Sequence, residues 1–113
     1  MLPVIKLMAE YSAWPLWWAY NDHVGDIDPY TLPIAPETVT RLLSWEAKYE
    51  AHLNWNDPAS SKWPSREAYE EFEREGFHLW LKLREELKDT YQVLYHSELL
   101  QHVITEPGEW PGI

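Results

Sequence analysis

The sequence predicts an α+β fold in which two main helices pack on one face of a small sheet of two or three strands. Two observations support this prediction. The segments 37–54 and 65–87 carry apolar residues at helical spacing, whereas the short segments 4–8 and 91–96 are rich in β-branched and aromatic residues. With 113 residues, the chain is long enough to form one core, so we expect a single domain over residues 1–113.

The segment 65–87 is the clearest helix. Its apolar and small residues recur at intervals of three and four, which produces one continuous stripe on a helix. Ser65 is a good N-cap, and the acids that follow it suit the positive end of the helix macrodipole. Gly76 costs about 1 kcal/mol relative to alanine in an exposed helix, so we expect another backbone to pass close to it. The stripe comprises Tyr69, Phe72, Gly76, Leu79, Trp80, Leu83 and Leu87.

The segment 37–54 predicts the other main helix. Pro36 suits its first turn or the residue just before it, because the N–H that proline lacks is not needed there. The apolar stripe of this segment is interrupted only by Glu46, and its opposite face, which includes Arg41 and Lys48, is expected to be solvated. The two helices would therefore meet the sheet through their apolar stripes.

The strands are less completely defined than the helices. Residues 4–8 and 91–96 predict two strands, but an isolated pair is only marginally stable, so we expect a third from residues 16–20 or 99–105. The stretch 97–105 also fits a short helix capped by Ser97. Without a third strand, one edge of the sheet would stay open to a partner.

The remaining segments predict irregular structure. Residues 10–20 carry aromatic side chains around Pro15, and residues 21–36 are punctuated by glycine and proline. Together they predict a long, ordered loop rich in aromatic residues and proline. Residues 106–113 contain two prolines and two glycines, so we expect a loosely held tail.

Composition limits the classes of partner. The formal net charge is −10, which repels nucleic acid and anionic membranes and attracts basic proteins. The chain has no cysteine, which excludes disulfides and thiol chemistry. We find no pattern of a secretory signal and no apolar run near the ~20 residues of a membrane span, so we expect a cytoplasmic protein.

One loop has residue types that suit a metal ion. Asp22, His23, Asp26 and Asp28 combine carboxylates and an imidazole within seven positions. Their spacing matches neither a calcium-binding EF-hand loop nor a zinc-binding HExxH helix, and aspartate is common in proline-rich turns for geometric reasons. We therefore favour a structural role for this loop and expect no cofactor.

Seven short motifs occur in an order that resembles a family of small, acidic bacterial proteins. The family members look like immunity proteins, the companions of secreted polymorphic toxins, and the resemblance covers about residues 7–95. It implies a non-enzymatic, toxin-binding role, and no catalytic residues come with it. The motifs are PLW at 15–17, VGDIDP at 24–29, LPI at 32–34, LNWNDPASS at 53–61, FEREG at 72–76, REEL at 84–87 and YQVLY at 91–95.

The resulting hypothesis is a binding protein that neutralises a basic toxin or effector by blocking its active site, with no direct contact to nucleic acid or membrane. Acids would steer the partner, and a tryptophan would anchor it. One alternative is a small metal-assisted enzyme that uses the loop from Asp22 to Asp28. Another is a structural homodimer formed through an open strand edge. The predicted partner contacts are Asp22, Asp26, Asp28, Asp57, Trp63, Glu70, Glu71 and Glu73.

Overall fold

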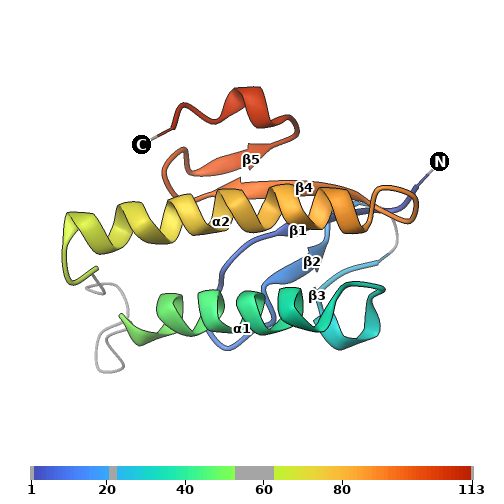
Figure 1. The fold of residues 1–113 in the computed structure, drawn as a ribbon, viewed down its shortest axis with the longest axis horizontal. Helices are drawn as coiled ribbons and strands as arrows, with labels where there is room; N and C mark the ends of the chain where they lie inside the picture. The colour runs from blue at the N-terminus through green and yellow to red at the C-terminus, as the bar shows by residue number, and fades with distance from the viewer. Residues whose placement is uncertain (1, 21–22, 53–62, 113) are drawn as a thin grey trace.

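The computed structural model describes residues 2–20, 23–52 and 63–112, and two helices cover one face of a mixed sheet in it (Figure 1). The strands lie in the order β3-β2-β1-β4-β5, with β1 parallel to β4 and the other neighbours antiparallel. Their bounds are β1 Val4–Leu7, β2 Leu16–Trp18, β3 Asp26–Ile27, β4 Gln92–Ser97 and β5 His102–Ile104.

The sheet has five strands, whereas the sequence predicts two or three. Both segments that were candidates for a third strand pair with the sheet, 16–18 with β1 and 102–104 with β4. The unexpected strand is β3, whose Ile27 lies opposite Leu16. A two-residue strand is too short to show an alternating pattern, so only its pairing with β2 defines it.

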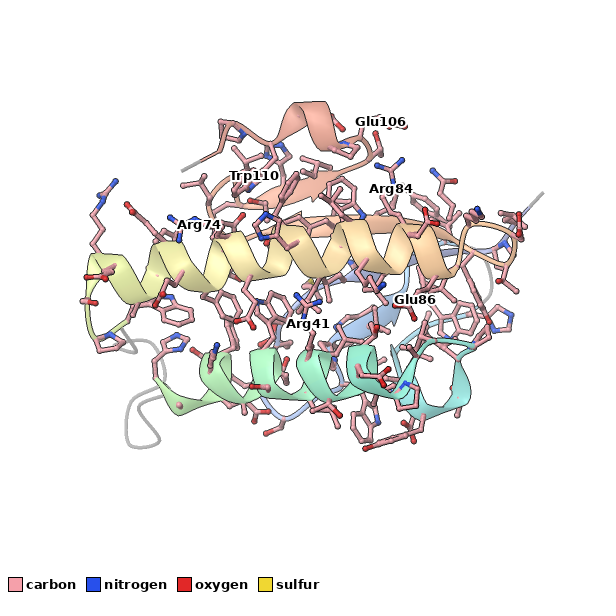
Figure 2. All side chains as sticks on the ribbon, viewed as in Figure 1. Arg41, Arg74, Arg84, Glu86, Glu106 and Trp110 are labelled. Atoms are coloured by element: carbon pink, nitrogen blue, oxygen red, sulfur yellow. The ribbon has the colours of Figure 1, made fainter. Side chains whose placement is uncertain are left out.

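The helices are α1 (Pro36–Ala51) and α2 (Arg66–Glu86). Ser65 caps α2, since its side chain accepts a hydrogen bond from the amide of Ala68. The start of α1 has no side-chain cap of its own. Instead, Glu86 extends from α2 toward α1 and accepts the N–H of Ala35 at 2.6 Å (Figure 2). The two helices are thus fixed to each other at this end as well as through the core.

The core lies between the helices and the sheet, where Ile5, Leu7 and Leu16 are fully buried. Trp45 of α1 stacks on Phe72 of α2, with ring centroids 4.5 Å apart. Trp80 binds the sheet directly, because its indole N–H donates to the carbonyl of Val93 at 2.8 Å. Neither α1 nor α2, among the parts of the chain that the structure describes, carries an apolar stretch able to cross a membrane.

The C-terminal segment packs on α2, whereas the sequence predicts a loosely held tail. A 3₁₀ helix, η3 (Pro107–Glu109), follows β5. Trp110 then stacks on Phe77 of α2, with ring centroids 4.1 Å apart, and its indole N–H donates to Glu73 at 3.0 Å. One aromatic side chain therefore offsets the effect of the surrounding prolines and glycines, which is why composition alone predicts a looser segment.

Candidate protein-binding site

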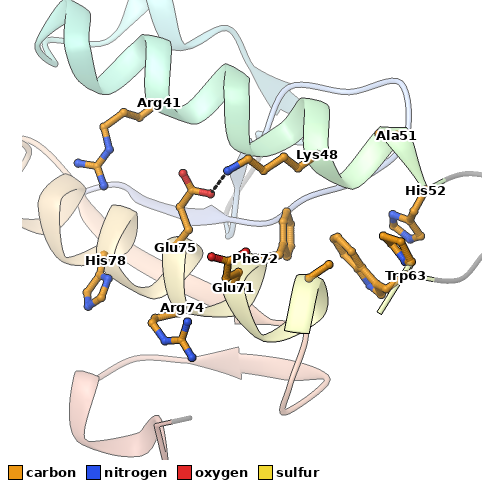
Figure 3. A pocket seen from close by; sticks show the side chains of 12 residues that line it. Arg41, Lys48, Ala51, His52, Trp63, Glu71, Phe72, Arg74, Glu75 and His78 are labelled. Carbon is orange, nitrogen blue, oxygen red and sulfur yellow. Dashed lines mark hydrogen bonds and ion pairs between the residues drawn. The ribbon is translucent and has the colours of Figure 1, made fainter. Parts of the chain in front are cut away.

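A groove of about 800 Å³ runs between α1 and α2 on the face of the helices that is turned away from the sheet (Figure 3). It takes side chains from both helices and from Trp63, which precedes α2. The sequence predicts α1's contribution as a solvated face, and the groove exists only because α2 packs beside it. Its two ends differ in chemistry, with aromatic side chains at one and basic side chains at the other.

The aromatic end is built around Trp63. Its ring stacks on His52, with ring centroids 4.2 Å apart and an angle of 19° between the planes, and it also packs against Phe72. The Nε2 atom of His52 lies 3.0 Å from the hydroxyl of Tyr11. Burial lowers the pKa of His52, so this imidazole is neutral at pH 7 and adds no charge to the groove. The half-buried Trp63 is therefore a firmly held apolar surface.

The other end of the groove is basic. Lys48 pairs with Glu75 at 2.8 Å, so these two charges largely offset each other. Arg41 and Arg74 form no ion pair among the described residues, and Arg41 is exposed. Three bases and two acids line the groove, a local formal charge of +1 in a chain whose net charge is −10. This reversal of charge is not visible in the sequence, because the bases come from different helices.

Only part of the predicted contact set belongs to this site. Trp63 and Glu71 line the groove, and the half-buried Glu70 lies on the same helix in an ion pair with Arg66 at 2.9 Å. Glu73 is fully buried, so the prediction that it contacts a partner is wrong for the fold described here. Its position four residues after Tyr69 and three before Gly76 places it within the apolar stripe, a signal that indicates burial.

The predicted aspartates lie elsewhere or outside the described residues. Asp26 accepts the amide of Trp14 at 2.8 Å, and Asp28 accepts the amide of Tyr30 at 2.9 Å. Both lie near β3, at the opposite end of the helical layer from the start of α2 (Figure 1). Asp22 and Asp57 fall outside the described residues.

These contacts also bear on the predicted metal loop. Asp26 and Asp28 each bind a backbone amide, as expected of aspartates that shape a loop. His23 stacks on Trp18, with ring centroids 4.6 Å apart. Within residues 2–20, 23–52 and 63–112, no three His, Asp or Glu side chains are placed to hold a metal ion together.

Glu46, on α1, has a second buried carboxyl group. It is the residue that interrupts the apolar stripe of this helix. Burial, together with the neighbouring Glu50 and Glu10, raises its pKa to about 9. One oxygen accepts the amide of Glu10 at 3.3 Å, and the other has no hydrogen-bond partner among the described residues. The side chain is therefore protonated at pH 7.

We expect Glu46→Gln to raise the free energy of unfolding by about 3–5 kcal/mol at pH 8 and by less than about 1 kcal/mol at pH 5. The folded chain keeps this proton between the ordinary carboxyl pKa of 4.5 and about 9, whereas the unfolded chain releases it. The wild type therefore loses stability as pH rises through this window, and glutamine has no proton to lose. Urea unfolding of both proteins from pH 5 to 9 measures the difference, and parallel curves would refute the raised pKa.

Together, the fold and the groove define a small α+β protein with an open, amphipathic surface groove between two helices. The family model described as Serratia CdiI immunity protein-like matches residues 3–98, so the chain belongs to this family. The resemblance to immunity proteins of polymorphic toxins is thereby confirmed, and it supports a toxin-neutralising role in general terms. No curated protein matches the chain at a significant level.

Proposed function

We propose that this protein neutralises a cognate basic toxin in the cytosol. It binds the toxin without catalysing a reaction and covers the toxin's active site. Membership of an immunity family supports the role, and the surface at the start of α2 supports the mode of binding. This acid-and-tryptophan surface consists of Trp63, Glu67, Glu70 and Glu71. It combines a firmly held aromatic anchor with carboxylates, the combination that suits a basic partner.

The observation that carries the proposal is that Trp63 and Glu71 line the same groove, with Glu67 and Glu70 on the same first turns of α2. Trp63 is fixed by stacking on His52, so little side-chain entropy would be lost when a partner covers it. Glu67 and Glu71 are exposed on the next two turns, and neither forms an ion pair among the described residues. The net charge of −10 would draw a basic partner toward the molecule, and this local group would orient it.

We expect the double variant Glu70→Lys, Glu71→Lys to bind the toxin about tenfold more slowly at low salt, because the steering charges are reversed. The partner to be tested is the purified product of the adjacent open reading frame. The matched control is Glu85→Lys, Asp89→Lys, which makes the same change in net charge at the far end of α2. Association rates measured by surface plasmon resonance at two salt concentrations distinguish the two.

Three outcomes would contradict the proposal in different ways. If the toxin does not bind the wild type, the neutralising role fails. If both double variants slow association equally, overall charge matters and the acid-and-tryptophan surface does not. If salt leaves the association rate unchanged, electrostatic steering plays no part.

A further inference from the structure

We propose that the groove between α1 and α2 receives a carboxylate-bearing segment of the toxin, whose apolar side chain packs on Trp63 while its carboxylate pairs with Arg41. This inference rests on the proposed function and adds a second, oppositely charged contact to it. The basic toxin would thus meet acids at the start of α2 and a base inside the groove.

The aromatic end of the groove suits an apolar side chain. Trp63 and Phe72 form its wall, and the small residues Ala51 and Ala68 leave room beside them. The whole groove, at about 800 Å³, lies within the range of roughly 300–1,000 Å³ that holds drug-sized ligands. A peptide segment of a few residues is of comparable size, and a flat partner surface would leave this space unfilled.

The basic end supplies the charge that selects the segment. Arg41 extends from α1 toward α2, as seen in Figures 2 and 3, and its guanidinium has no ion-pair partner among the described residues. A guanidinium presents two parallel N–H groups that match a carboxylate. Lys48 is paired with Glu75, whereas Arg41 and Arg74 form no ion pair among the described residues, and Arg41 is the more exposed of these two arginines.

Charge complementarity favours an acidic peptide over other occupants. At the Arg41 end of the groove, a lysine or arginine from the toxin would be repelled at close range. This end therefore discriminates against the sign of charge that Glu71, elsewhere in the same groove, and the rest of the molecule attract. Nucleic acid would match Arg41 but not a chain with a net charge of −10. The toxin is therefore expected to present an apolar residue and, several residues away in the same extended segment, an aspartate or glutamate, because Arg41 lies about three turns of α1 from the end of the groove at His52 and Trp63.

The test compares Arg41→Gln with Lys88→Gln in binding to the purified toxin. Each substitution removes one positive charge from an exposed side chain, and Lys88 lies beyond the far end of α2. We expect Arg41→Gln to raise the dissociation rate about tenfold and Lys88→Gln to leave it unchanged. Unchanged thermal melting of both variants would show that the loss is one of binding.

Site-specific cross-linking identifies the occupant. A photoreactive benzoylphenylalanine at Ala68, in the groove, is expected to capture a toxin peptide that contains an acid, whereas the same group at the exposed Thr90 captures none. Replacing that acid of the toxin by arginine should then restore tight binding between the altered toxin and the variant Arg41→Glu. The inference is overturned if Arg41→Gln binds normally, or if Ala68 captures a basic peptide or a second copy of this chain. The proposed function survives those results and fails only if the toxin does not bind at all.

Discussion

Replacement of Glu73 by alanine is expected to lower the free energy of unfolding by about 3–5 kcal/mol. The carboxyl group of Glu73 is fully buried and accepts hydrogen bonds from four groups. The hydroxyl of Tyr95 donates at 3.1 Å, the amide of Glu98 at 3.0 Å and the indole of Trp110 at 3.0 Å, and the hydroxyl of Ser97 also donates. Alanine would leave all four without this acceptor.

The effect is expected to be large because Glu73 joins three parts of the fold. It lies on α2, its donors lie on β4 and in the turn that follows, and Trp110 belongs to the C-terminal segment. Loss of the carboxyl group should therefore also release the segment after β5 from the helix. That segment lies beyond residues 3–98, which the family model matches.

Urea unfolding of Glu73→Ala measures the loss, with Glu70→Ala as the control. Glu70 lies on the same helix one turn earlier, half-exposed and paired with Arg66, so its removal should cost less than about 1 kcal/mol. Hydrogen exchange of residues 98–112 should quicken in Glu73→Ala only. Equal unfolding midpoints for the two variants would contradict the central role of Glu73.

Sequence periodicity predicts the helices well, because their signals are local. The predicted helix 65–87 is α2, Arg66–Glu86, and its predicted cap Ser65 makes the expected hydrogen bond. The strand predicted at 91–96 is β4, one residue later. In both segments, the residues that determine the element lie within it, so no knowledge of distant contacts is needed.

What sequence analysis misses depends on contacts between distant segments. β3 exists through its pairing with β2, and Trp110 is ordered by α2, far away in the chain. The groove needs both helices side by side before Arg41 and Trp63 belong to one site. The buried acids are a different case. Glu46 and Glu73 both occupy positions within an apolar stripe, so the spacing of residues in the sequence is enough to predict the burial of Glu73 as well as that of Glu46.

The glycine at position 76 correctly predicts close packing, but the kind of group that packs there differs from the prediction. The sequence predicts a close backbone at this position, whereas the structure places two side chains there. A β-carbon on Gly76 would lie 2.5 Å from the hydroxyl oxygen of Tyr95 and 2.8 Å from the ring of Trp45. Trp45 is held by its stacking on Phe72 and by the hydrogen bond from its indole N–H to the carbonyl of that residue at 2.9 Å. The contact therefore cannot be relieved by moving a free side chain.

We therefore expect Gly76→Ala to lower the free energy of unfolding by about 1–3 kcal/mol, and Gly76→Leu to lower it by more. The sign is diagnostic, because the same change in an open helix raises stability by about 1 kcal/mol. Gly108→Ala is the control, since nothing lies within 4 Å of a β-carbon built there. Thermal and urea unfolding of the three variants measure the ranking. If Gly76→Ala melts at or above the wild-type temperature, Trp45 and Tyr95 can move aside, and the tight packing of α2 against α1 and β4 does not limit stability at this point.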